Sequence, residues 1–579
     1  MKKIIPILLV LAMLIGCGST NDITSKAQTI TAEPTQATVV EAPDIVLDAV
    51  AKSNSDELKG DASILLSDEE IVISGEGATA QGSVVTISAA GEYTISGTLS
   101  NGQIIVDTDS SEKVKLVLNG VDITCQDAPP IYIINAQKKV VIELANDSIN
   151  MVEDGAVYSD VSEDAPSAAI FSKEDLDIDG SGTLYVTGNY SKGIYSKDDL
   201  SIEGGTIIVS SVDDGIRGKD SIEMSGGTVT INAGADGFRT SNETDQEKGY
   251  IIISGGELYI TAGQDGIQAV TDCTISNATI SISCGGGSEN SSQKSEDWGS
   301  WGGGKGGKGG YQSNTVSTSD ATSAKGIKAT GSLSILSGKI SIDSSDDAIH
   351  SNDTITISGG EIFILSGDDG VHADANVIIN AGVLTIDKSY EGIEALSIDI
   401  LGGSISVVAS DDGINAAGGN DGSSMGGRPG QNNFASSDSG LVTISGGEIV
   451  LSASGDGLDS NGNIVQTDGS VVVYGPTNSG NGPLDYNGSY TLTGGSLLAV
   501  GASGMAQKVS NCSQGQLAVT LNANAGSSIE IYNESGENIL SFTTPKSMQC
   551  LVCSTPSIVA GQSYTLVLDG QQLGEITAQ

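Results

Sequence analysis

Short runs in which apolar and polar residues alternate fill the chain from about residue 71 onward. Ile71 to Ile73 and Val84 to Ile87 are the first of them, and Gly or Asp stands where the runs are interrupted. Alternation with a period of two is typical of β-strands that bury one face, and Gly and Asp favour turns. Helical patterns are scarce. The hydrophobic pattern therefore predicts an all-β protein.

A short phrase around a central Gly or Ala recurs through the middle of the chain. It reads Asp213-Asp214-Gly215-Ile216-Arg217 at one place and Asp368-Asp369-Gly370-Val371-His372 at another, and the common step between phrases is 22 residues. Between the phrases, a Gly-Gly pair joins two alternating runs, as in residues 200–209. Each repeat thus holds three short strands and three turns.

A unit this small cannot bury its own apolar face, so the units must stack, each strand beside its equivalent one coil away. Parallel crossover connections are almost always right-handed. The repeat therefore predicts a right-handed parallel β-helix with three strands per coil, coils of about 22 residues and β caps at its ends. The predicted segments follow in chain order: signal peptide 1–17, flexible tether 18–60, N-terminal β entry or cap 61–165, parallel β-helix 166–495 with projecting loops 285–323 and 418–438, and C-terminal β cap 496–579.

The first residues resemble a secretion signal. Lys2 and Lys3 precede an apolar stretch that ends in Leu14-Ile15-Gly16-Cys17. This order resembles the bacterial lipobox, in which the cysteine becomes the lipidated first residue of the mature protein. We expect lipidation at Cys17 and a location on the extracellular face of the cell membrane, with the lipid as the sole membrane contact.

The charge balance is strongly acidic. Lys and Arg number 26 against 73 Asp and Glu, which gives a net charge of −47. Such a field repels nucleic acid and attracts hard cations that prefer oxygen ligands. We expect no nucleic-acid partner, and we expect a monomer.

Stacking of the repeats would place the acidic turns on top of one another. Like charges at the strand spacing repel, and Ca²⁺ relieves this repulsion by accepting about 6–8 oxygen ligands. The alternative is that Asp-Asp-Gly is simply favourable turn chemistry. The predicted calcium ligands are Asp213, Asp214, Asp236, Asp265, Asp346, Asp347, Asp368, Asp369, Glu391, Asp411, Asp412 and Asp456.

The position two residues after the central Gly forms a second column, which we expect to point outward because the intervening Ile or Val points inward. Together with two tryptophans of the first loop, this column supplies the candidate carbohydrate-binding residues: Arg217, Arg239, Lys328, His350, His372, Glu394, Trp298 and Trp301. Two alternatives stay open. The paired histidines could bind a transition metal, and the tryptophans could pack back onto the coils instead of stacking on sugar rings.

The segment from Gly91 to Leu99, the run Val117 to Val121, the repeated Asp-Asp-Gly-Ile phrases, the Gly-rich loop with its tryptophans and the motif Gly426 to Gly430 carry a family resemblance. Over about residues 60–570 the chain resembles the bacterial family of carbohydrate-binding domain-containing proteins. The resemblance implies a β-helix similar to that of pectate-type polysaccharide lyases, bound calcium, and affinity for plant-type or acidic polysaccharide.

Three functions compete at this point. The first is a tethered module that binds polysaccharide with calcium. The second is a calcium-dependent lyase, which needs an unprotonated Lys or Arg as base; Lys328 is its best candidate, and Arg217 and Arg239 are possible. The third is a surface adhesin without a sugar ligand.

Overall fold

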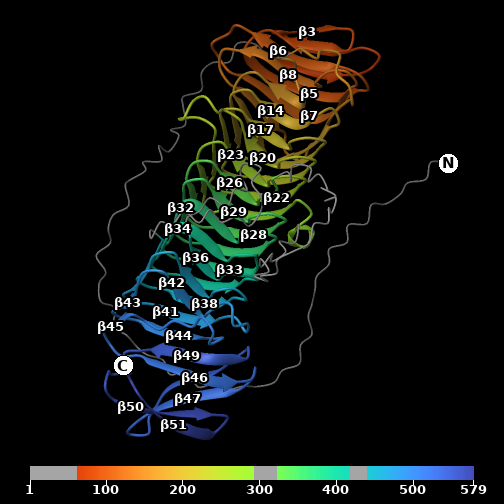
Figure 1. The fold of residues 1–579 in the computed structure, drawn as a ribbon. Coiled ribbons are helices and arrows are strands. Elements are labelled where there is room, and N and C mark those ends of the chain that lie inside the picture. The colour runs from red at the N-terminus through yellow and green to blue at the C-terminus, as the bar shows by residue number, and fades with distance from the viewer. Residues whose placement is uncertain (1–60, 163, 292–322, 418–439) are drawn as a thin grey trace, which may run out of the picture. The chain divides into compact units, whose positions relative to one another are not determined.

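The computed structural model describes residues 61–162, 164–291, 323–417 and 440–579. The predicted signal peptide with Cys17, the tether, Trp298, Trp301 and the 418–438 loop lie outside the described residues. Within these ranges the chain is all-β with a mostly parallel sheet, an arrangement consistent with a β-helix (Figure 1). The described part contains one 3-10 turn, η1 (Ser288–Asn290). It holds no helix long and apolar enough to cross a membrane.

The strands form three columns, and from β11 to β29 each strand pairs in parallel with the strand three places further along the chain. The first column consists of β4 (Val84–Ile87), β6 (Gln103–Thr108), β8 (Ile131–Ala136), β11 (Ala168–Ser172), β14 (Lys192–Ser196), β17 (Ile216–Gly218), β20 (Phe238–Thr240), β23 (Ile267–Ala269), β26 (Ile327–Ala329), β29 (Ile349–Ser351), β32 (Val371–Ile379), β34 (Ile393–Ile400), β36 (Ile414–Ala416), β39 (Leu458–Ser460) and β42 (Leu484–Tyr486).

The second column takes in the C-terminal halves of β32 and β34. Its other members are β1 (Asp61–Leu66), β5 (Gly91–Leu99), β7 (Val114–Cys125), β9 (Val140–Leu144), β12 (Leu176–Gly180), β15 (Asp199–Ile202), β18 (Ser221–Met224), β21 (Tyr250–Ile253), β24 (Cys273–Ile275), β27 (Leu333–Ile335), β30 (Thr354–Ile357), β37 (Leu441–Ile444), β40 (Asn463–Gln466), β43 (Tyr490–Leu492) and β45 (Asn511–Cys512).

The third column begins with the C-terminal ends of β5 and β7. It continues through β10 (Ile149–Asp154), β13 (Thr183–Gly188), β16 (Thr206–Ser211), β19 (Thr228–Ala233), β22 (Glu257–Ala262), β25 (Thr279–Cys284), β28 (Lys339–Ser344), β31 (Glu361–Ser366), β33 (Val383–Lys388), β35 (Ser404–Val408), β38 (Glu448–Ser452), β41 (Ser470–Tyr474) and β44 (Ser496–Gly501).

Antiparallel pairs lie at both ends of the columns. β1 pairs with β2 (Val72–Gly75), and β3 (Ala78–Gln81) pairs with β4. At the other end, β49 (Met548–Ser554) joins β44 to β46 (Leu517–Ala523). A separate four-stranded sheet follows, with the order β48 (Asn538–Thr543), β47 (Ser528–Asn533), β50 (Ser563–Leu568) and β51 (Gln571–Thr577). These pairings lie in segments for which the sequence predicts caps.

The core is a set of aliphatic ladders between the columns. Ile194, Ile216 and Phe238 face one another across three successive coils, and each is fully buried. Because every apolar residue packs against its equivalents above and below, the alternating pattern of one coil becomes a continuous core. The long insertions leave the stack intact: β23 pairs with β26 across the first, and β34 with β37 across the second.

Glycine makes the bend between the second and third columns possible. Gly227 adopts φ 79°, a left-handed conformation that other residues rarely adopt. A Cβ on Gly227 would also lie 2.8 Å from the carbonyl oxygens of Gly204 and Gly205 in the neighbouring coil. The Gly-Gly element of the sequence therefore marks a bend at which successive coils touch through their backbones.

Candidate cation site along the carboxylate ladder

The residue just before each central Gly or Ala points a polar side chain along the turn that leads into the first column. We call this series the carboxylate ladder and each member a rung; its rungs are Lys192, Asp214, Asp236, Asp265, Lys325, Asp347, Asp369, Glu391, Asp412 and Asp456. The stacking of acidic turns that the repeat predicts is thus present among the described residues, with lysine at two rungs.

Most aspartate rungs also hold the next turn in place; Asp214, whose Oδ1 has no hydrogen-bond partner among the described residues, is the exception. The Oδ1 atom of Asp236 accepts a hydrogen bond from the amide of Asp265 at 2.9 Å. The Oδ1 atom of Asp347 accepts one from the amide of Asp369 at 3.1 Å. Asp369 in turn accepts from the amide of Glu391 at 3.1 Å. One carboxylate oxygen is therefore used for turn structure, as the alternative of favourable turn chemistry expects, and the second oxygen stays available for a cation.

In the N-terminal coils that second oxygen meets a basic side chain three residues further on. Arg217 lies 3.2 Å from Oδ2 of Asp214, and Arg239 lies 3.0 Å from Oδ2 of Asp236. Lys328 lies 3.7 Å from Asp265. The ladder and the column that we expected to bind sugar are therefore one network, in which Arg217 and Arg239 pair with the rung three residues before them and Lys328 pairs with a rung of the preceding coil.

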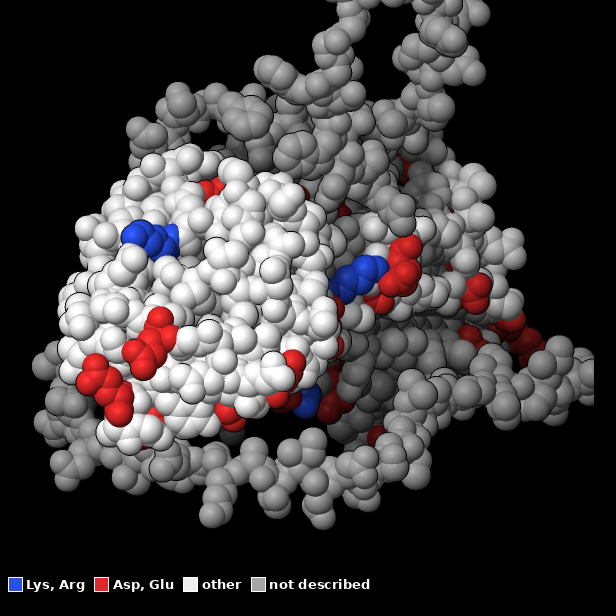
Figure 2. Space-filling view, turned by 60° about the horizontal axis from the view of Figure 1, so that its bottom comes forward, with Lys and Arg blue, Asp and Glu red and all other residues white. Residues whose placement is uncertain are grey.

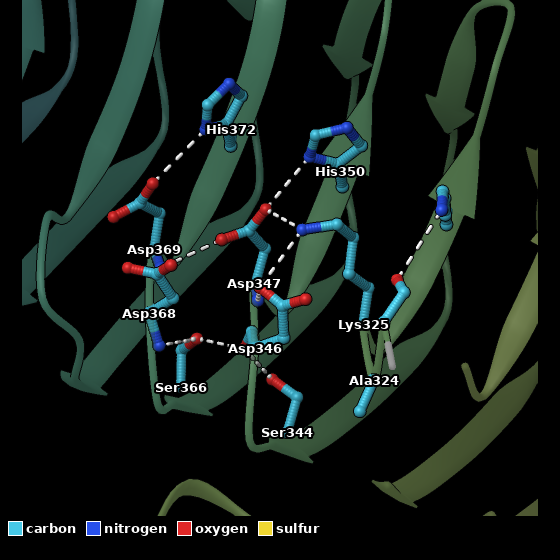
Figure 3. Close-up of polar contacts among 12 residues, drawn as sticks. Ala324, Lys325, Ser344, Asp346, Asp347, His350, Ser366, Asp368, Asp369 and His372 are labelled. Carbon is cyan, nitrogen blue, oxygen red and sulfur yellow. Dashed lines mark hydrogen bonds and ion pairs between the residues drawn. The ribbon is translucent and has the colours of Figure 1, made fainter. Parts of the chain in front are cut away.

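The middle of the ladder is built around Lys325. Its ammonium lies 2.5 Å from Oδ2 of Asp347 and 3.0 Å from Oδ1 of Asp346, and Nδ1 of His350 lies 2.9 Å from the same Asp347 oxygen (Figure 3). Burial alone would lower the pKa of Lys325, but the charges of Asp347 and Asp346 raise it overall. We did not predict Lys325 or Lys192 as site residues. The signal was a lysine in the place of the second Asp of the repeated phrase.

The outward orientation predicted for His350, His372 and Glu394 is wrong. Their exposed fractions are 2%, 0% and 5%, so none of them offers a surface to a polysaccharide. His350 and His372 each contact the carboxylate of the rung three residues before them, and Glu394 contacts His372 of the neighbouring coil. By contrast, the side chains of Arg217, Arg239 and Lys328 keep exposed fractions of 21%, 32% and 19%.

The C-terminal rungs lack this compensation. The column that supplies Arg217 and Arg239 upstream supplies Glu394, Asn415 and Asp459 here. No Lys, Arg or His of the described ranges forms an ion pair with Asp412, Asp456 or Asp459. Burial and neighbouring carboxylates raise the pKa of Asp456 to about 6 and that of Asp459 to about 8. They also raise the pKa of Asp412 well above its ordinary value.

The geometry around Gly455 gathers oxygen atoms at these rungs. A Cβ on this glycine would collide with an oxygen of Asp411 and an oxygen of Asp412. The amide of Asp456 donates to Oδ1 of Asp412 at 2.5 Å, and the amide of Gly482 donates to Asp456 at 2.6 Å. These hydrogen bonds hold the carboxylates in place, and no described basic residue compensates their charge. Such a group of fixed carboxylate oxygens suits a cation that prefers oxygen ligands.

Elsewhere in the described part, Asp213 pairs with Lys192 at 2.6 Å, and Asp368 belongs to a group whose oxygens lie within 4.8 Å of those of Asp346 and Asp347. The structure adds one acidic group that the sequence did not single out, Asp175, Asp198 and Asp199, whose oxygens also lie within 4.8 Å of one another. Lys325 stands between the group of predicted ligands from Asp213 to Asp265 and the longer group from Asp346 to Asp456. The face turned forward in Figure 2 shows acidic side chains only in small scattered groups.

A row of exposed aromatic side chains lies on the third column. Tyr185 on β13, Tyr259 on β22 and Phe363 on β31 have exposed fractions of 44%, 38% and 37%. The pairing register places them in one row, three coil steps apart, and the intervening positions include Thr230, Ser281 and Ser341. These outward positions of alternating strands were not among the predicted binding residues.

Comparisons with known proteins bear on the chain as a whole. A family model described as carbohydrate-binding domain-containing protein matches residues 81–370. A protein of Acetivibrio thermocellus with the same description is 47% identical over 204 residues, which cover 35% of this chain and 71% of that protein. A solved structure of a polysaccharide lyase-like protein from C. thermocellum, a gadolinium derivative, is 38% identical, covers 39% of this chain and 92% of that one, and gives a TM-score of 0.38. The family predicted from the sequence is confirmed: the chain belongs to the carbohydrate-binding domain-containing proteins.

Proposed function

We propose that this chain is a lipid-anchored protein of the cell surface that binds polysaccharide in a calcium-dependent manner. Family membership supports carbohydrate as the ligand class. The lipobox-like segment ending at Cys17 supports the anchor. We further propose that the scaffold is a right-handed parallel β-helix with three strands per coil, which the three columns of parallel pairings support.

The observation that supports calcium binding is the change in charge compensation along the ladder. Two carboxylates one strand spacing apart, about 4.8 Å, repel by about 3 kcal/mol at an effective dielectric constant near 20. Arg217, Arg239 and Lys325 relieve this repulsion at their rungs. At the C-terminal rungs the corresponding positions are not basic, and a bound cation would supply the positive charge that no described basic residue supplies there.

The donor set there fits Ca²⁺. Asp411, Asp412, Asp456 and Asp459 supply only oxygen, and calcium accepts about 6–8 oxygens at roughly 2.3–2.6 Å in flexible geometry. Backbone carbonyls of the turns and sugar oxygens would complete the shell. A calcium ion shared in this way would attach an acidic sugar to a protein surface that otherwise repels it.

The aromatic row of Tyr185, Tyr259 and Phe363 is the proposed sugar-binding face. Aromatic rings stack on the apolar faces of sugar rings, and hydroxyl groups between them can donate and accept hydrogen bonds. Three coils at about 4.8 Å each place neighbouring rings about 14 Å apart. A linear polysaccharide lying along the row would therefore contact successive rings a few sugar units apart.

Cleavage of the polysaccharide is not part of the proposed function. The lyase alternative needs a free base, but Lys328 lies 3.7 Å from Asp265 in an ion pair. Arg217 and Arg239 are likewise paired, with Asp214 and Asp236. These contacts assign the three side chains to the ladder.

Binding of the purified mature chain to insoluble cellulose and to immobilised polygalacturonate tests the proposal. We expect retention with Ca²⁺ and much weaker retention after chelation with EGTA. The pair of substitutions Tyr259→Ala and Phe363→Ala should reduce retention at least tenfold, whereas Tyr532→Ala, on the C-terminal sheet, should leave it unchanged. Equal retention in Ca²⁺ and EGTA would refute the calcium requirement. Absence of retention on every polysaccharide would refute the carbohydrate function.

A further inference from the structure

His372 lies among carboxylates in a way that the calcium proposal does not use. Its Nδ1 atom is 3.2 Å from Oδ2 of Asp369 and 3.2 Å from Oε2 of Glu394. Strands β32 and β34 bring His372 and Glu394 side by side in parallel register, and Asp369 is the rung three residues before His372. All three side chains are more than nine-tenths buried.

These distances match the edges of a small coordination polyhedron. Zinc binds histidine nitrogen and carboxylate oxygen at about 2.0–2.2 Å, which places neighbouring ligand atoms about 3.0–3.6 Å apart. The ligand atoms of Asp369, His372 and Glu394 all lie within 4.8 Å of one another. A cation could therefore be bound after small side-chain shifts, without movement of the strands.

The surroundings resemble the outer shell of a metal-bound histidine. Such a histidine usually directs its second ring nitrogen toward a carboxylate, and its carboxylate ligands are themselves hydrogen-bonded. Nε2 of His372 lies 3.5 Å from Oδ1 of Asp374. Oδ1 of Asp369 accepts the amide of Glu391, which leaves Oδ2 for a ligand role.

The local charge also calls for a cation. The basic groups nearest along the ladder are already used, since Lys325 and His350 both contact Asp347. Asn415 lies one coil beyond Glu394 in register, and its buried Oδ1 has no hydrogen-bond partner within the described residues. A protonated His372 would supply one positive charge against the carboxylates of Asp369, Asp374 and Glu394, so the cluster stays negative.

We propose that Asp369, His372 and Glu394 bind a divalent first-row transition cation such as Zn²⁺ or Co²⁺. The imidazole nitrogen sets the class of ion, because imidazole suits zinc and its neighbours whereas calcium takes oxygen ligands. This site is separate from the C-terminal rungs proposed for calcium, although Asp369 is one of the predicted calcium ligands, and it does not depend on the proposed carbohydrate function. The cation displaces a proton from His372, and it joins β32 to β34 across one coil.

Cobalt uptake by the full chain tests the site. The protein is stripped with chelator, supplied with excess Ca²⁺ to fill oxygen-only sites, and titrated with Co²⁺ while its visible absorption is followed. The variants are His372→Gln and Glu394→Gln, each near the size of the original side chain. The matched control is Asp236→Asn, an equivalent rung whose partner is Arg239. Circular dichroism reports whether each variant is folded.

We expect one equivalent of Co²⁺ with a visible band that Zn²⁺ abolishes. Affinity should fall at least about 100-fold in His372→Gln and in Glu394→Gln, since loss of even an outer-shell partner weakens binding about 10–100-fold. Asp236→Asn should bind like the wild type. Absence of uptake by the wild type would overturn the proposal, as would equal uptake by either folded variant. If one variant fails to fold, the other decides.

Discussion

Replacing Lys325 with methionine removes the one ammonium that lies between Asp346 and Asp347 while it keeps the length of the side chain. The side chain of Lys325 is 2% exposed, and that of Asp347 is fully buried. Breaking a buried ion pair leaves an uncompensated charge in low dielectric and typically costs about 3–5 kcal/mol. We therefore expect Lys325→Met to lower the free energy of unfolding by about that amount.

Lys339→Met is the matched control. Lys339 also pairs with a carboxylate one coil away, Glu361 at 3.2 Å, but both side chains are about two-thirds exposed. Exposed pairs contribute about 0–1 kcal/mol, so this variant should unfold almost like the wild type. The two substitutions change the same residue type within one coil and differ mainly in burial.

The assay is equilibrium unfolding in urea, together with amide hydrogen exchange, because stacked repeats need not unfold in a single step. Loss of protection should be centred on β26 and β29 in Lys325→Met. Adding Asp347→Asn to Lys325→Met should recover part of the loss, since the second change removes the orphaned charge. Equal stability of Lys325→Met and Lys339→Met would refute the claim that the ladder depends on internal cations.

Three further predictions concern other parts of the fold. Gly227→Ala should destabilise the protein by more than about 1 kcal/mol, because the added Cβ meets the adjacent coil. Gly120 has a similar φ of 81° but nothing within 4 Å of an added Cβ, so Gly120→Ala should have a smaller effect in thermal unfolding. Calcium at 100 times its Kd should raise the free energy of unfolding by about 2.7 kcal/mol, and the paired changes Asp412→Asn and Asp456→Asn should abolish the effect; a persisting effect would place the ion elsewhere. Of the six described cysteines, Cys512 alone should react with a thiol reagent before unfolding, because the other five are buried; prompt labelling of more than one would contradict the packing.

The repeated phrase was enough to predict which residues share a column. The 22-residue step makes Asp347 and Asp369 neighbours, and the structure places them in adjacent turns joined by a hydrogen bond. Alternation likewise predicted the inward ladder of Ile and Val. Both results follow because a stacked repeat turns a sequence period into a spatial one.

Side-chain direction at the edge of a strand could not be predicted in the same way. Period-two alternation assigned His372 to the outside, yet it is fully buried against Asp369. Alternation describes which face of a strand a residue occupies, but it does not describe the i, i+3 contact that a long side chain makes with the preceding turn. Tyr259 and Phe363 were missed for the opposite reason, since an aromatic residue in an alternating strand is usually taken for core.

A repeat that stacks has a general electrostatic consequence. An aspartate that stabilises one turn is harmless alone, but repetition at every coil creates a column of buried like charges. Departures from the repeated phrase, such as Lys192 and Lys325 in rung positions and Arg217 beside one, supply the opposite charges. Where the departures stop, around Asp412 and Asp456, no described basic side chain pairs with the rungs, and it is there that we propose a calcium ion. The coils that matter for cation binding are therefore of two kinds: those in which a basic residue replaces or faces a rung, and the C-terminal coils in which it does not.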